Sequence, residues 1–399
     1  MTKFNIKTYN NIALKGLERL PKESFILNDS DDPEGVILRS YNLHEEPINP
    51  LLLAVARAGA GYNNIPVDAL ADEGVVVFNT PGANANSVKE LVLSTMIAHA
   101  RNMFQAKDWA DELTGEDIPG QVEKGKSQFQ GWEIRGKTMG VIGLGSIGHL
   151  VANDAQALGM NVIGYDPYIS VEAAWKINQY VTQAPSLEEV LQKSDYLTIH
   201  VPYTKDTHHL IDEHAVNLMK DHAVLLNFSR ADLIDEEAVV KALNHQRLGS
   251  YITDFPNDTV RGNEHCVLLP HLGASTIEAE ANSAVMAANQ LKAYLETGEI
   301  INSVNYPNVQ MRLTSPTRIS VCNRNVRNII AYLSSLLSEQ DINIDRIINK
   351  SRGELAYTLV DVPETDKEKL DKIIKDLNEQ DGILKARLIK DKKHDAWYA

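Results

Sequence analysis

Charged or titratable side chains follow three apolar runs in the second half of the chain. Arg230 ends "AVLLNFSR", Asp254 and Asp258 lie in "TDFPND" at the end of a further run, and His271 follows "CVLLP". Such runs indicate buried strands, and the carboxyl ends of parallel strands line one ligand crevice. An imidazole, a carboxylate and a guanidinium gathered there form the set that oxidation of a 2-hydroxy acid needs. The imidazole takes the hydroxyl proton, the guanidinium binds the substrate carboxylate, and the carboxylate keeps the imidazole oriented and basic.

A glycine-rich turn precedes these residues. "VIGLGSIGHL" spaces Gly143, Gly145 and Gly148 as G-x-G-x-x-G between an apolar run and a helical pattern. This spacing gives a tight turn, lets a pyrophosphate approach the backbone and lets helix and strand pack closely. Asp166 ends the next apolar run, "NVIGYD", where a carboxylate accepts the ribose hydroxyls and repels a 2′-phosphate. The sequence therefore predicts a dinucleotide site that prefers NAD to NADP.

The elements that must position these residues alternate between short apolar runs and helical patterns. This alternation favours parallel βαβ units. We therefore expect an α/β fold with two doubly wound parallel-sheet domains, followed by a βαββαβ module. We predict one long helix over 85–113 and a polar loop over 114–132. The predicted domains are a discontinuous substrate-binding domain (1–92 and 282–310), a Rossmann NAD-binding domain (93–281) and the C-terminal module (317–399).

Composition limits the kind of protein. A formal net charge of −15 over 399 residues argues against nucleic acid and anionic membranes as main partners. Two cysteines, Cys266 and Cys322, cannot form a disulfide framework and indicate a reducing compartment. No secretory or membrane-spanning pattern is recognisable, so we expect a cytoplasmic protein. His208, His209 and His214 have no metal-ligand spacing, and no metal is expected.

These motifs together resemble the D-isomer-specific 2-hydroxyacid dehydrogenase family. "PHLGAST" looks like the branch of that family that acts on 3-phosphoglycerate, and "ARAGAGYNNI" and "NTPGANANSVKEL" are similar to its first domain. The C-terminal module resembles an ACT regulatory domain. The resemblance implies NAD-dependent oxidation of 3-phospho-D-glycerate to 3-phosphohydroxypyruvate, the entry step of L-serine synthesis. Two alternatives stay open: a dehydrogenase for another D-2-hydroxy acid, and a non-catalytic NAD-sensing scaffold.

The resemblance also implies roles for individual residues. Arg230 would bind and polarise the substrate, and His271 would be the general acid/base. The substrate site would include Arg39, Ser40, Arg57, Gly59 and Asn79. The cofactor would be held by Gly143, Gly145, Ser146, Ile147, Gly148, Asp166, His200, Pro202, Asn227, Phe228, Ser229, Asp254 and Gly273.

The histidine-orienting segment departs from the family pattern. The family's glutamate is missing from "TDFPNDTV", which offers Asp254 and Asp258 instead. Alignment without a gap places Asp258 on that glutamate, so we predict Asp258 as the catalytic partner of His271 and Asp254 as a residue at the nicotinamide end.

The turn before the first helix of the C-terminal module also departs from the family pattern. Asn323 replaces a histidine there and Arg327 a proline. Binding of a regulatory amino acid such as serine therefore stays open. Relatives of this type imply a homodimer or a larger oligomer.

Overall fold

The computed structural model describes residues 3–390, including every side chain within them except that of Glu172. The chain forms two compact units. The first holds the described residues up to Ala83 together with those from Glu280 onwards, and the second holds Asn84–Ala279. Within residues 3–390, each helix is too short or too polar to cross a membrane.

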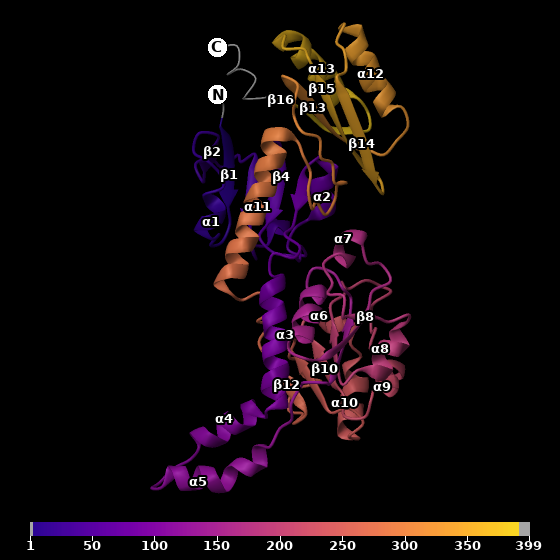
Figure 1. Ribbon diagram of the computed structural model, residues 1–399. Coiled ribbons are helices and arrows are strands. Elements are labelled where there is room, and N and C mark those ends of the chain that lie inside the picture. The colour runs from indigo at the N-terminus through magenta and orange to yellow at the C-terminus, as the bar shows by residue number, and fades with distance from the viewer. Residues whose placement is uncertain (1–2, 391–399) are drawn as a thin grey trace. The chain divides into compact units, whose positions relative to one another are not determined.

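A five-stranded parallel sheet forms the centre of the first unit, in the order β2-β1-β3-β4-β5 (Figure 1). Its strands are β1 (Phe4–Thr8), β2 (Phe25–Leu27), β3 (Gly35–Leu38), β4 (Ala54–Arg57) and β5 (Val76–Phe78). The helices around it are α1 (Leu14–Leu17), α2 (Val67–Asp72) and the long α11 (Ile277–Thr297). Buried alanines on α11 and β4 share one core with Ile6 and Phe78.

A seven-stranded parallel sheet forms the second unit, in the order β12-β11-β10-β9-β6-β7-β8. The strands are β6 (Thr138–Ile142), β7 (Asn161–Tyr165), β8 (Thr182–Gln183), β9 (Tyr196–Ile199), β10 (Val224–Asn227), β11 (Ser250–Thr253) and β12 (Cys266–Leu268). Alternate residues of the central strands enter two different cores, so both faces of the sheet are covered, as continuous apolar strands require. Strand order reverses between β6 and β9, the switch point where doubly wound sheets bind ligands.

Helices cover this second sheet and form one extension from it. The helices are α3 (Ala85–Ala100), α4 (Met103–Asp111), α5 (Ile118–Gly125), α6 (Gly148–Ala157), α7 (Val171–Ala174), α8 (Leu187–Lys193), α9 (Glu213–Leu218) and α10 (Glu236–Asn244). Ser186 caps α8 by accepting a hydrogen bond from the Glu189 N–H. In Figure 1, α4 and α5 extend away from the sheet as a pair of short helices.

The predictions for 85–132 were wrong in two places. The long helix ends at Ala100, and Asn102 adopts a left-handed conformation with φ of 49° before α4 begins. The predicted loop contains α5, because the Asp117 carboxylate accepts the Gly120 N–H and caps that helix. The Trp109 and Phe129 rings, 5.3 Å apart, pack the two segments together.

The C-terminal module has the predicted βαββαβ order. It consists of β13 (Thr317–Arg324), α12 (Ile329–Glu339), β14 (Arg346–Arg352), β15 (Leu355–Val362), α13 (Lys367–Glu379) and β16 (Ile383–Lys390). The sheet is antiparallel in the order β14-β15-β13-β16, and both helices pack on one of its faces. Residues 391–399 of the predicted module lie outside the described residues.

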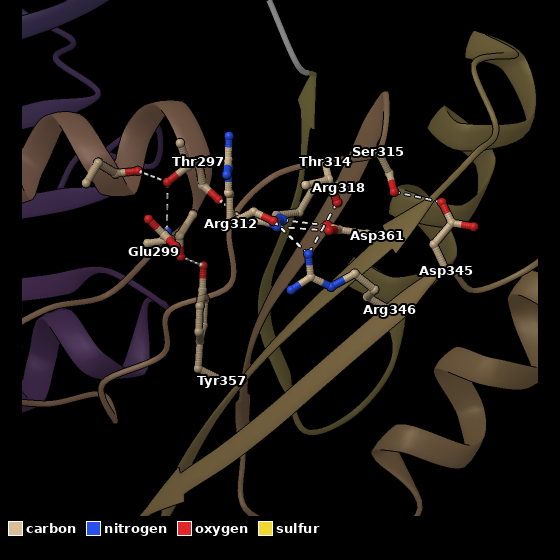
Figure 2. Close-up of polar contacts among 12 residues, drawn as sticks. Thr297, Glu299, Arg312, Thr314, Ser315, Arg318, Asp345, Arg346, Tyr357 and Asp361 are labelled. Atoms are coloured by element: carbon tan, nitrogen blue, oxygen red, sulfur yellow. Dashed lines mark hydrogen bonds and ion pairs between the residues drawn. The ribbon is translucent and has the colours of Figure 1, made fainter. Parts of the chain in front are cut away.

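The other face of this antiparallel sheet packs inside the first unit. Cys322 and Tyr357 share a core with Tyr294 of α11 and Tyr306. Figure 2 shows Arg318 of β13 bonded both to the Asp361 carboxylate and to the carbonyl oxygen of Thr297, the last residue of α11. The module is therefore attached by a hydrogen-bonded junction as well as by its linker.

Candidate active site

The glycine-rich turn joins β6 to α6, as the sequence predicts. A Cβ on Gly143 (φ 85°) would lie 2.6 Å from the His200 carbonyl oxygen, and one on Gly148 would lie 1.8 Å from that of Gly143. A Cβ on Gly145 would meet no described atom within 4 Å. Gly143 and Gly148 therefore serve the close packing of the turn, whereas Gly145 and the exposed Ser146 leave the backbone open. The N–H groups at the start of α6 can receive a pyrophosphate there.

Asp166 lies directly after β7 and is fixed to the glycine-rich turn. Its Oδ2 accepts the Leu144 N–H at 2.9 Å, and its Oδ1 accepts the Tyr168 N–H at 2.9 Å. Each carboxylate oxygen keeps further acceptor capacity. The group that would bind the ribose is thus held at a set distance from the backbone that would bind the pyrophosphate, and these residues fit NAD.

His200 follows β9 and is half-buried beside the same turn. Its Nε2 lies 3.0 Å from the Thr198 hydroxyl, while its buried Nδ1 finds no hydrogen-bond partner in the described part of the chain. Burial lowers the pKa of His200 to about 3. The imidazole is therefore neutral near pH 7 and suits a packing or binding role better than proton transfer. Pro202, two residues further, is exposed.

The segment after β10 presents Arg230. Asn227 is fully buried, and its amide donates to the Arg230 carbonyl at 2.9 Å while accepting the Ser229 N–H at 3.2 Å. The Ser229 hydroxyl donates to the Ile199 carbonyl at 2.6 Å, and Phe228 is buried. The backbone is thus anchored, while the Arg230 side chain is exposed at the sheet edge, where it can bind an anion.

His271 lies in the turn after β12 and is also exposed. Its backbone N–H donates to the Asp254 carbonyl at 2.9 Å, and the Asp254 carboxylate accepts the Gly273 N–H at 3.0 Å. The Asp258 side chain is 97% exposed and forms an ion pair with Arg261 at 3.3 Å. The structure thus brings Asp254 to the His271 turn and leaves Asp258 on the surface. The pairing of Asp258 with His271 stays a prediction that this placement disfavours.

The predicted substrate residues follow three neighbouring strands of the first unit. Arg39 follows β3 and pairs with Glu280 at 2.7 Å. Arg57 ends β4, and its Nε donates to the Asn64 side chain at 3.0 Å. A Cβ on Gly59 would lie 2.2 Å from the Arg57 guanidinium, so glycine makes room for it.

Two further predicted residues adjoin these arginines. Asn79 follows β5, and its amide donates to the Ala60 carbonyl at 2.6 Å. Ser40 is held by its N–H, which donates to the Asn10 side chain at 3.1 Å. The strand order therefore gathers two cations and several amide groups at one edge of the first sheet.

Sequence reasoning missed the residues that support these side chains. Asn64 bonds Arg57 and the Tyr41 carbonyl, Thr198 contacts His200, and the Ser87 hydroxyl donates to the Gly273 carbonyl at 2.8 Å. Asn64 and Ser87 lie in no recognisable motif, and the Tyr41 and Gly273 carbonyl groups that they bond are 23 and 186 residues away. Thr198 alone carried a signal, as a polar residue within the apolar run "YLTIHV".

Comparison with known proteins agrees with this arrangement. The family model for the D-isomer specific 2-hydroxyacid dehydrogenase, NAD binding domain, matches residues 93–273. The chain is 30% identical over 354 residues to D-3-phosphoglycerate dehydrogenase 1 of Saccharomyces cerevisiae. This alignment covers 82% of the chain and 72% of that protein. It is 38% identical over 264 residues to D-3-phosphoglycerate dehydrogenase of Methanocaldococcus jannaschii, 65% of the chain. It spans about half (48%) of that relative's length.

A solved structure shares the fold. The NAD+-bound 3-phosphoglycerate dehydrogenase of Entamoeba histolytica superposes with a TM-score of 0.60 at 27% identity, covering 76% of this chain and 99% of that one. The two parallel sheets belong to the shared fold, which confirms the predicted α/β class. With its glycine-rich turn and Asp166, the second unit is an NAD-binding domain, and the chain belongs to the D-isomer specific 2-hydroxyacid dehydrogenase family.

Proposed function

We propose that this protein oxidises 3-phospho-D-glycerate to 3-phosphohydroxypyruvate with NAD, the entry step of L-serine synthesis. The observation that carries the proposal is the placement of Arg230 and His271 after β10 and β12, at the sheet edge that also holds the glycine-rich turn. A cation and a titratable imidazole beside a dinucleotide site are what oxidation of a 2-hydroxy acid requires. The phosphoglycerate dehydrogenases among its relatives support this choice of substrate class.

The residues divide the chemistry between them. NAD, when bound, supplies the hydride acceptor. The Arg230 guanidinium holds the substrate carboxylate, because its backbone is anchored and its exposed side chain has further donors besides the Nη1 group that bonds the Ser229 carbonyl. His271 accepts the hydroxyl proton as the alcohol becomes a ketone, and returns it in the reverse direction. We assign the other predicted cofactor residues, including Asp254, to the support of this site.

Two arginines of the first unit favour a phosphorylated substrate. In a chain with a net charge of −15, a dianionic phosphate needs local cations to offset the overall repulsion. Arg57 is held by Asn64, and Arg39 by Glu280. We assign these two guanidinium groups to the substrate anion.

The test is to follow NADH formation with 3-phosphoglycerate and, in parallel, with D-lactate, D-glycerate and 2-hydroxyglutarate. We expect the highest kcat/KM with 3-phosphoglycerate. A higher value with another of these acids would overturn the substrate assignment and favour the alternative D-2-hydroxyacid dehydrogenase. Measurable NAD binding without turnover of any of them would favour the non-catalytic scaffold.

Replacement of Arg57 by glutamine tests the phosphate assignment. Loss of a charge-assisted contact should raise the KM for 3-phosphoglycerate about ten-fold or more. The KM for D-glycerate, which lacks the phosphate, should stay within about two-fold because that contact is not made. Arg261→Gln, which removes an exposed arginine of the other unit, is the control. An equal loss with both substrates would assign Arg57 to the carboxylate or to the fold.

Regulation, assembly and location complete the proposal. We propose that the C-terminal module is an ACT-like regulatory domain and that an amino-acid effector binds at the turn after β13. Asn323, in β13 just before that turn, is buried, and its Oδ1 has no hydrogen-bond partner within residues 3–390. We further propose a homodimer or larger oligomer in the cytoplasm.

A further inference from the structure

The register of β11 and β12 places Asp254 beside His271. The two strands pair in parallel, with Thr253 opposite Leu268, and the ladder continues as the Leu269 N–H donates to the Thr253 carbonyl at 3.0 Å. One residue further after β11 and two residues further after β12, the His271 N–H donates to the Asp254 carbonyl at 2.9 Å. Backbone hydrogen bonds alone therefore make these two residues neighbours.

The Asp254 side chain also holds the His271 turn. His271 has φ of 39°, a left-handed conformation that is unusual for a residue other than glycine. The Asp254 carboxylate accepts the Gly273 N–H just beyond it, and the Phe255 ring meets the imidazole edge-to-face at 4.9 Å. The segment Asp254–Phe255 thus contacts the turn at the strained residue itself and two residues beyond it, at Gly273.

The Asp254 carboxylate is poorly compensated as a buried charge. Asp254 is 1% exposed, and its Oδ1 finds no hydrogen-bond partner among the described residues. Burial raises the pKa of this carboxyl, while the Gly273 N–H and the charge of His271 oppose the rise. A buried carboxylate in such a place can offset a positive charge that forms beside it.

Other groups around Asp254 do not supply that countercharge. The peptide N–H groups of Asp254, Leu272 and Gly273, which lower the pKa of the Asp254 carboxyl, are neutral, whereas His271 acts on it through its charge. Ser87 and Val88 of α3, which pack on Gly273, are uncharged. The imidazole is therefore the group on which the charge of Asp254 acts.

We propose that Asp254, rather than Asp258, is the positioning residue for His271: it fixes the turn and stabilises the imidazolium that forms when His271 accepts the substrate's hydroxyl proton. The inference rests on the proposed function, in which His271 is the base and the hydride from C2 goes to NAD. It assigns to an aspartate at the end of β11 the task that the family gives to a glutamate further along this segment. The near-complete burial of Asp254 argues against direct contact with the cofactor.

Asp254→Asn is the main test, because asparagine keeps the shape and can still accept the Gly273 N–H, but carries no charge. We expect kcat for 3-phosphoglycerate oxidation to fall at least about ten-fold, with the KM for NAD within about two-fold. The acid limb of the kcat/KM profile should move to lower pH, because an imidazolium without its carboxylate loses its proton more readily. Asp254→Glu should restore the position of the limb.

Measurements of stability distinguish a positioning role of Asp254 from a purely structural one. A raised carboxyl pKa means that ionisation costs the folded state stability above that pKa, and the cost disappears as pH falls through it towards the unfolded value. Asp254→Asn should therefore be at least as resistant to urea as the wild type near neutral pH, and this advantage should vanish in acid. A less stable variant with an unmoved acid limb would overturn the proposal in favour of a structural role.

Two further variants distinguish the remaining outcomes. Asp258→Asn tests the alternative partner of His271. If the acid limb of the kcat/KM profile moved in this variant and not in Asp254→Asn, the proposal would be overturned. Asp221→Asn, on the surface of the same unit, is the control for loss of an acidic charge. Failure of the proposed function itself would appear as a wild type without turnover, or as an active His271→Ala variant, whatever Asp254 does.

Discussion

Two regions of the molecule differ in how completely they bond their buried polar groups, although each leaves some without a partner among the described residues, Arg387 Nε in the first of them. At the junction between α11 and the C-terminal sheet, arginines bond three of the last four carbonyl groups of the helix. Arg318 donates to Thr297, and Arg387 donates to Tyr294 and Leu295. At the carboxyl edge of the seven-stranded sheet, by contrast, His200 and Asp254 each bury a polar atom without a hydrogen-bond partner in the part of the chain described.

The difference follows from what each region has to hold. Carbonyl groups at the end of a helix have no intrahelical partner, and cations there also interact favourably with the helix dipole. The junction meets this need from within the chain, including a fully buried Arg318–Asp361 pair (Figure 2). The sheet edge keeps incompletely bonded groups, which are typical of sites that bind and react. Substitutions at the junction should therefore cost stability, and those at the edge mainly function.

The largest effect is expected for Asp361→Asn at the junction. Both carboxylate oxygens bond Arg318, at 2.6 and 3.0 Å, and both side chains are fully buried. Removing one partner leaves an uncompensated buried charge and should lower the free energy of unfolding by about 3–5 kcal/mol. Urea unfolding followed by circular dichroism measures this.

Two further variants sharpen the test of the junction. Glu123→Gln breaks an exposed ion pair with Lys126 and should change stability by less than about 0.5 kcal/mol. Replacing both partners by apolar residues, Arg318→Met with Asp361→Leu, should recover part of the loss, because no charge is then left alone. If Asp361→Asn were as stable as the wild type, the contrast between the two regions would not hold.

The parts of the site that the sequence predicts are those set by local pattern. The glycine spacing, Asp166 at a strand end, and Arg230 and His271 after apolar runs are each visible within about ten residues. The continuity of the apolar runs also predicts both sheets, because strands buried on two faces consist of consecutive apolar residues. Two strands are exceptions: β1, whose "FNIKT" alternates with polar residues although the strand lies inside its sheet, and the two-residue edge strand β8.

The role of the two aspartates could not be predicted in this way. Asp254 and Asp258 differ little in local sequence, and one is 1% exposed while the side chain of the other is 97% exposed. That difference comes from the parallel register of β11 with β12 and from the turn after Pro256, which bring Asp254 under the backbone of a segment 17 residues later. Long-range pairing of this kind leaves no mark within a short window.

A smaller effect, dependent on pH, is expected from His200 at the sheet edge. Burial holds its pKa at about 3, so the folded protein keeps it neutral while the unfolded chain takes up a proton below about pH 6.5. Stability is therefore lost as pH falls, by about 2 kcal/mol at about pH 5. His200→Gln should lose correspondingly less between about pH 7 and 5 in urea unfolding, whereas His214→Gln, on the surface, should follow the wild type. Parallel curves for all three proteins would show that His200 is accessible to protons in the folded state.

The smallest and most selective test places the same substitution at two glycines of one turn. In Gly148→Ala the new Cβ would lie 1.8 Å from the Gly143 carbonyl oxygen, so the turn must shift, at a cost of about 1–3 kcal/mol in stability. In Gly145→Ala the Cβ meets no described atom within 4 Å, so stability should change by less than about 0.5 kcal/mol. The added methyl group nevertheless occupies the space through which a pyrophosphate approaches the backbone, and the Kd for NAD should rise about ten-fold or more. Calorimetric titration with NAD and urea unfolding of both variants decide the matter. If Gly145→Ala bound NAD as tightly as the wild type, the open backbone at this glycine would not be the pyrophosphate site. The distinction between positions that serve stability and positions that serve binding would then fail for two glycines only three residues apart.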